Sequence, residues 1–170
     1  MKIRLPIVLC SLFAITLFIG SHGATSTLFA QQTEEAHFMA ELSGKSGIPP
    51  NLSTKTIGNA IFTVTQDGNE MLYTVNAVNI NHVTDVVLVF LTGSVTSNVA
   101  FLRSGSQQGA TGTINGLLVQ GNITSSNLAG LLKGKQISDL VKDMLDGNIY
   151  LRVSAMKFPL EIIGKVTPAE

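Results

Sequence analysis

Histidine is the first residue type to consider, because its imidazole binds metal ions and transfers protons near neutral pH. The chain has three histidines, His22, His37 and His82. His22 belongs to the N-terminal segment described below, and His37 and His82 stand at no metal-ligand spacing and beside no pair of carboxylates. Since a working site needs several converging groups, we expect both to be surface or turn residues. The sequence therefore predicts no metal site, no cofactor and no catalytic residue.

Serine and carboxylate residues are frequent, but they form no catalytic pattern. The Gly-x-Ser-x-Gly motif of a nucleophilic serine does not occur, and too few histidines remain for a Ser-His-Asp triad. We interpret Asp85 as a strand-entry residue, Asp139 and Asp143 as residues of a helix surface, and Lys133-Gly134-Lys135 as a solvated turn. The expectation is that the protein is not an enzyme.

The N-terminus has the layout of a secretory signal. Basic residues precede an apolar run over residues 5–20, and small and polar residues follow it. Cleavage after Ala30 is preferred because a small residue fits the peptidase, and cleavage after Gly23 or Ala24 is the alternative. The run is shorter than the roughly 20 apolar residues that span a bilayer, so we expect cleaved export rather than an uncleaved membrane anchor.

Removing 30 of 170 residues leaves 140, a size that suits one domain with its own core. We divide the chain into a signal peptide over residues 1–30, a flexible segment over 31–36 and a β-domain over 37–168. The single cysteine, Cys10, lies in the segment that is removed. The mature chain is thus expected to have no disulfide, no thiol chemistry and no cysteine metal site.

Charge is sparse and balanced. The chain carries 11 basic and 11 acidic residues, and loss of Lys2 and Arg4 leaves 9 against 11. The charges form no runs, which argues against a nucleic-acid partner. After the N-terminal segment no stretch is long and apolar enough to suggest a membrane crossing.

The remaining sequence predicts an all-β domain, because Val, Ile, Thr, Gly and Asn favour strands joined by turns. Apolar residues alternate with others in the first strands, and Asp67-Gly68 is typical of a tight hairpin. Residues 83–91 are almost continuously apolar, which indicates a strand covered on both faces. The predicted strands lie at residues 38–43, 60–64, 71–78, 83–91, 99–102, 114–119, 147–154 and 158–166, with a turn at 47–50, a polar loop at 104–112 and a turn at Pro159.

One short helix is predicted near Ser138–Asp146. Ser138 can cap its start, and Gly147 can take the left-handed conformation after its end. Apolar residues at helical spacing form one stripe, which we expect to pack on the sheet rather than to form a partner groove: Ile137, Leu140, Val141, Met144 and Leu145.

Several short motifs follow one another along the chain, and their order and spacing together are more specific than any single motif. They lie at residues 38–44 with 48–50, 58–62 with 67–68, 72–75, 121–124, 127–130, 137–140, 147–154 and 161–166. On these motifs the chain resembles the CHRD domain family from His37 to Val166, a module first described in the animal protein chordin and common in exported microbial proteins. The resemblance implies an antiparallel β-sandwich similar in outline to copper/zinc superoxide dismutase, and it makes Glu161 a structural position.

The chain departs from the family at its histidines. Family members usually carry a His-x-His pair on the strand that corresponds to Val86–Leu91, where Leu88, Val89 and Phe90 stand here, and a further histidine at the position of Ser154. Such imidazoles could converge on a metal ion, whereas aliphatic, aromatic and hydroxyl side chains do not replace them. We expect core packing in place of a polar site.

The sequence thus indicates an exported, non-enzymatic module that is a protein-binding or structural component, with an unidentified protein partner, at the cell surface, in the periplasm or in the medium. One alternative is a metal-binding protein or enzyme of the superoxide dismutase type, and another is a carrier of a small apolar ligand, which requires an internal cavity. Asn51 and Asn122 begin N-glycosylation sequons, which matter only in a host that modifies exported proteins.

Overall fold

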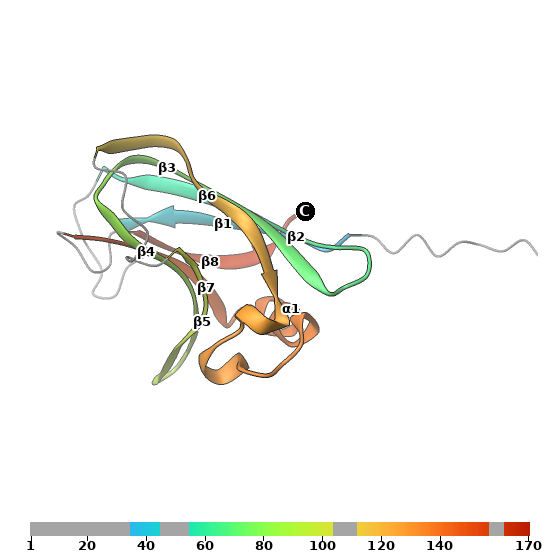
Figure 1. Ribbon diagram of the computed structural model, residues 1–170. Helices are drawn as coiled ribbons and strands as arrows, with labels where there is room; N and C mark the ends of the chain where they lie inside the picture. Colours follow the sequence, from blue (N-terminus) through green and yellow to red (C-terminus); the bar gives the residue numbers. More distant parts are fainter. Residues whose placement is uncertain (1–34, 45–54, 104–111, 157–161) are drawn as a thin grey trace, which may run out of the picture. The chain divides into compact units, whose positions relative to one another are not determined.

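The computed structural model describes residues 35–44, 55–103, 112–156 and 162–170, which fall within one compact unit (Figure 1). The expected signal segment, the predicted turn at 47–50, residues 104–111 of the polar loop and Pro159 lie outside the described residues. Within the described ranges, the helices are too short and too polar to cross a membrane.

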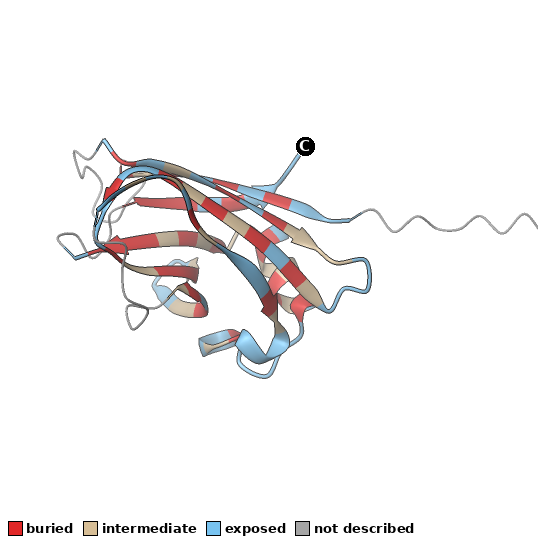
Figure 2. Ribbon diagram, turned by 45° about the horizontal axis from the view of Figure 1, so that its top comes forward, coloured by how far each residue is buried: buried red, intermediate tan, exposed pale blue. Residues whose placement is uncertain are grey.

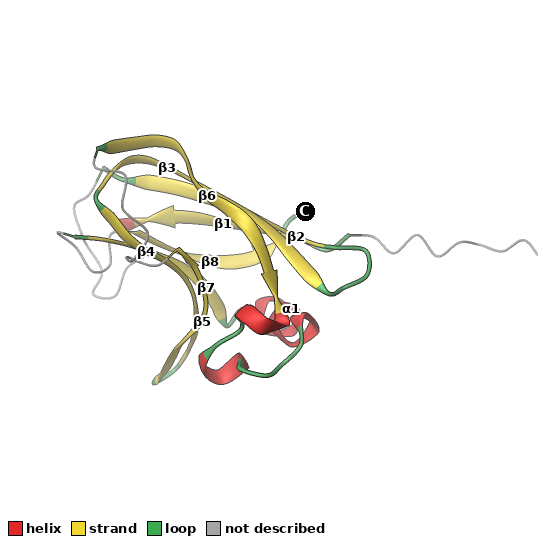
Figure 3. Cartoon of the chain, viewed as in Figure 1, coloured by secondary structure: helices red, strands yellow, loops and turns green. Residues whose placement is uncertain are grey.

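Eight antiparallel strands form one continuous sheet in the order β5-β4-β7-β8-β1-β2-β3-β6. The sheet is curled, so its two halves face each other, and residues of the edge strands β5 and β6 approach (Figure 3). The predicted all-β antiparallel fold is confirmed, with two halves of one curled sheet serving as the layers of the sandwich. The strands are β1 (His37–Ser43), β2 (Ile57–Val64), β3 (Glu70–Asn81), β4 (Val83–Thr92), β5 (Val95–Arg103), β6 (Thr113–Thr124), β7 (Ile149–Ala155) and β8 (Ile162–Pro168).

Short helices follow β6, namely η2 (Ser125–Asn127), η3 (Gly130–Leu132) and α1 (Ile137–Leu145). The predicted helix is confirmed, but its cap was assigned to the wrong residue. Gln136 occupies the N-cap because the helix begins at Ile137, before Ser138, and the Gln136 backbone N–H donates to Asp139 Oδ2 at 2.9 Å, as in a capping box. Ser138 is exposed, and Gly147 has the expected positive φ of 73°. The prediction that Leu145 packs on the sheet with the rest of the stripe was wrong, because this last residue of the helix is exposed.

The core lies inside the curl. Buried and exposed side chains alternate along the strands, as period-2 geometry requires (Figure 2). The two halves of the sheet and α1 contribute to one cluster of buried residues. Tyr73 on β3 spans this cluster, and its hydroxyl donates to the carbonyl of Leu102 on β5 at 3.2 Å. Burial raises the pKa of Tyr73, since the phenolate is costly away from water.

Strand β4 is buried on both faces, as its continuous apolar sequence predicted. Four successive residues, Val86 to Val89, are buried. Val86 and Leu88 belong to the main core, and Val87 and Val89 lie on the opposite side of the strand. An apolar run thus identifies a strand with no water-facing side at its centre.

We predict that Val89→Asp strongly destabilises the domain. Val89 is 3% exposed, so an aspartate there buries a carboxyl group that its apolar surroundings do not satisfy, at a cost of about 3 kcal/mol or more. The matched control is Val95→Asp on β5, because Val95 is 47% exposed and its replacement should cost about 0.5 kcal/mol or less. Thermal unfolding followed by circular dichroism compares the two variants. Equal melting temperatures would contradict the burial of β4.

Candidate functional site

The two histidines considered as metal ligands lie at opposite ends of the sheet. His37 starts β1, is exposed, and has Nδ1 3.0 Å from Thr63 Oγ1. Thr63 is paired in turn with Leu72, and His82 lies ten residues beyond Leu72, so on the order of 30 Å separates the histidines at about 3.3 Å per residue. His82 is an exposed turn residue with a φ of 50°. The structure does not bring them together.

The positions where the resembled family carries histidines fall on two faces. Ser154 on β7 is paired with Asp85, Arg152 with Val87, and Tyr150 with Val89, so the side chain of Ser154 shares a face with Val87 and Val89. Leu88 and Phe90 face the core on the other side of β4. Ser154 is only 5% exposed. The described residues at these positions therefore make a packed region rather than a polar pocket.

The described carboxylates that the sequence analysis considered do not form a metal-ligand cluster. Asp85 lies near the start of β4, Asp139 binds the N-terminus of α1, and Asp143 is on the same helix. Glu161 lies outside the described residues. In the portion of the chain that the structure describes, no three His, Cys, Asp or Glu side chains gather as a metal-ligand set.

Asp67 has a structural task in the β2–β3 hairpin. Its carboxylate accepts hydrogen bonds from Thr65 Oγ1 at 2.6 Å, from the Asn69 backbone N–H at 3.1 Å and from Asn69 Nδ2 at 3.0 Å. These donors stabilise the charged form and lower the pKa of Asp67. Gly68 follows with a φ of 70°, as the Asp-Gly pair predicted. The cluster fixes the turn that places β2 beside β3.

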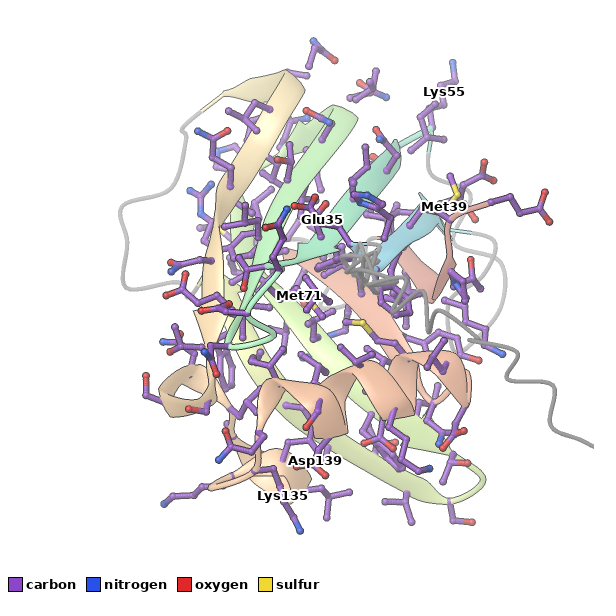
Figure 4. The ribbon with its side chains drawn as sticks, turned by 90° about the vertical axis from the view of Figure 1, so that its right-hand side faces the viewer. Glu35, Met39, Lys55, Met71, Lys135 and Asp139 are labelled. Atoms are coloured by element: carbon purple, nitrogen blue, oxygen red, sulfur yellow. The ribbon has the colours of Figure 1, made fainter. Side chains whose placement is uncertain are left out.

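An exposed apolar surface is the feature that the sequence analysis missed. The outward side chains of β1, β2, β3 and β6 form what we call the outer face. Figure 4 shows Met39 on the outside of the sheet and Met71 among the core side chains. Ladder pairs put these exposed residues on the same side, for example Met39 with Ile61 and Ile57 with Val78. The large apolar residues of the outer face are Met39, Ile57, Ile61, Leu72, Val78 and Leu117.

Charge is nearly absent from the strands of this face. β2, β3 and β6 together contain one charged residue, Glu70, which accepts a hydrogen bond from Asn122 Nδ2 at 2.9 Å. Asn, Gln and Thr side chains fill the positions between the apolar ones. The core of a protein–protein interface is depleted of charge in the same way. The sequence could have indicated this face, because apolar side chains occur among both the inward and the outward residues of β2.

A hollow of about 480 Å³ lies at one end of the outer face. Gly58 is one of its lining residues, and a Cβ atom there would lie 2.6 Å from the carbonyl oxygen of Asn76, so a larger residue does not fit at this position. Glu41 is the one charged residue among the described residues that line it. The other lining residues are Leu42, Ser43, Ile57, Asn59, Asn76, Ala77 and Val78. The hollow combines aliphatic walls, amide groups and one carboxylate.

Comparison with known proteins gives one match. A family model described as CHRD domain matches residues 38–165, which is 128 of the 170 residues. The match includes all eight strands in whole or in part and the hollow on the outer face. No curated protein and no solved structure matches the chain.

We predict that the purified protein binds neither Cu²⁺ nor Zn²⁺ stoichiometrically and has no superoxide dismutase activity. Such sites use several imidazole or carboxylate ligands, and His37 and His82 lie far apart. Titration calorimetry on tag-free protein, with elemental analysis of the protein as isolated, tests this. One tightly bound equivalent that is lost in His37→Ala or His82→Ala would overturn the prediction.

Proposed function

Because the chain belongs to the CHRD domain family, we propose that it is a non-enzymatic module that binds a partner protein outside the cytoplasm. CHRD domains are generally non-enzymatic and occur in secreted or extracellular proteins. The order of basic, apolar and small residues over positions 1–30 supports export of this chain. The family assignment alone does not identify the partner, since one fold serves many functions.

The observation that carries the proposal is the outer face. Six large apolar side chains stand exposed there among polar ones, and the four strands carry two acidic residues, Glu41 and Glu70, and no Lys or Arg. Exposed apolar groups lose unfavourable contact with water when a partner covers them. A sheet surface of this composition suits a protein partner better than a nucleic acid or an anionic membrane, because both of those require clusters of Lys or Arg.

The hollow suggests which side chain of the partner would be inserted. Ile57 and Val78 offer aliphatic contact, Asn59 and Asn76 offer amide groups, and Glu41 supplies a negative charge. A lysine or arginine would place its methylene stem on the aliphatic residues and its cation near Glu41. We therefore propose that the partner contributes a basic side chain within an otherwise neutral contact.

Two rival functions draw less support. A metal protein of the superoxide dismutase type needs converging ligands, and the described histidines and carboxylates are dispersed. A carrier of a small apolar ligand needs an internal cavity, whereas the hollow found here is on the outside of the sheet and the curl is filled by one cluster of buried side chains.

Export predicts a defined N-terminus. Cleavage after Ala30 leaves Gln31 as the first residue, because the peptidase reads the small residue that follows the apolar run. Intact-mass measurement of the protein recovered from outside the cytoplasm of its host gives the cleavage position. A membrane-embedded species that retains Met1 would instead make the protein an anchored one.

If the outer face binds the partner, Ile61→Lys should prevent the specific capture of that partner protein. Ile61 is exposed at the centre of the outer face, so a lysine there leaves folding intact but buries a charge when the partner docks. Wild-type protein is used as bait in cell-surface fractions, and we expect the variant to recover the bound partner with at least about tenfold lower yield.

The matched control is Leu145→Lys, because Leu145 is exposed on α1, outside the outer face. This variant should capture the same partner as the wild type. Equal capture by the Ile61 variant would exclude the outer face as the binding surface. Copurification of a metal ion or a lipid in place of a protein would favour one of the rival functions.

A further inference from the structure

The two edges of the curled sheet are unequal. On β5, the segment after η2 covers part of the edge, since the Ala129 N–H donates to the Val99 carbonyl at 2.8 Å and Leu128 forms a bridge with Ala100. The Leu131 N–H also donates to Ser97 Oγ at 3.3 Å. The β5 edge is therefore partly occupied by the protein's own chain.

The edge formed by β6 has no backbone pairing of this kind among the described residues, although parts of β5 and η2 lie near β6. β6 pairs with β3 on one side, and no described strand pairs with its other side. Natural proteins protect open edges with lysine, other charges or proline. The 12 residues of β6 contain no Lys, Arg, Asp, Glu or Pro. An open, uncharged edge of this length is a template for pairing with another strand.

We propose that β6 pairs antiparallel with β6 of a second copy of this chain, joining two curled sheets edge to edge. A twofold contact joins the same strand edge of both copies. Any charged side chain on that edge would therefore lie opposite or near the same charge of the second copy. β6 avoids that repulsion because it carries no charge. The proposal does not rest on the partner-binding function, since the backbone groups of the strand edge make the pairing, although the side chains that meet across it include Leu117 of the outer face.

The bulge in β6 specifies the register of this pairing. In the β3–β6 ladder, Asn115 and Leu117 lie on the outer face before the irregularity, and Gln120 and Asn122 lie on it afterwards. Between them, Leu118 and Val119 both pack toward the core. Inward and outward positions are therefore symmetric about the centre of the strand, between Leu118 and Val119.

A twofold axis at that centre keeps each face intact across the junction. It places Leu117 opposite Gln120 of the second copy, and Asn115 opposite the second copy's Asn122, with all four side chains on the outer face. Leu118 meets Val119 on the core side. A shift by one residue would set outward against inward positions, which sheets disfavour. The face pattern of β6 therefore predicts a single register for the pairing of the two strands.

Sedimentation velocity of the purified full chain over a concentration series tests the proposal, and we expect a monomer–dimer equilibrium. In Leu117→Lys/Gln120→Lys, the lysine at position 117 of each copy faces the lysine at position 120 of the other copy. These two repulsive pairs should raise the dimer dissociation constant by about tenfold. Leu117→Lys/Gln120→Glu changes the same positions but sets opposite charges face to face, so it should dimerise as well as the wild type or better. Because Leu117 and Gln120 are exposed, both variants should keep the wild-type melting temperature.

Leu72→Lys is the control for the outer face, since Leu72 is exposed on β3, one strand in from the edge. It should leave the dimer unchanged. A wild-type chain that stays monomeric at every accessible concentration would overturn the proposal. So would an equal effect of the two double variants, or a dimer that only Leu72→Lys dissociates.

Discussion

The structure depends on one constraint, which is that the sheet must cover its own apolar face. Eight strands carry a continuous inner row of buried side chains, and the main helix, α1, has only nine residues. Burial of apolar surface is the dominant favourable term in folding, so the strands curl until their halves meet around one core. Tyr73 marks that closure, because its hydroxyl reaches the carbonyl of Leu102 from the opposite half.

Local patterns predicted the eight strands and α1, but not η2 or η3. Alternation of apolar residues located β1 and β2, and Asp67-Gly68 identified the hairpin because that pair tolerates positive φ. The continuous run at Val86–Val89 indicated burial on both faces. The helix cap was wrong because Ser138 suits an N-cap by residue type, whereas the helix begins at Ile137 with Gln136 as its N-cap, and Asp139 accepts the hydrogen bond of the Gln136 backbone N–H.

The sheet order and the outer face were beyond local patterns. Strand order depends on contacts between residues far apart in sequence, such as β3 with β6. The face of Ser154 followed only from its pairing with Asp85, and this register separates it from Leu88 and Phe90. Alternation was used to choose a core face, so apolar residues such as Ile61 and Leu72 on the other face attracted no attention. Their significance appears when the strands lie side by side.

The seam between β1 and β8 governs when the domain can fold. β1 is the first strand of the sheet along the chain and β8 the last, yet they are neighbours and join the half containing β2, β3 and β6 to the half containing β4, β5 and β7. At this seam Gly164 passes so close to the carbonyl of Glu41 that a Cβ atom would overlap it. A chain still being synthesised lacks β8, so the two halves of the sheet cannot be joined until the last strand is present. Completion of the core is therefore tied to the last strand, because neither half of the sheet can cover its apolar face alone.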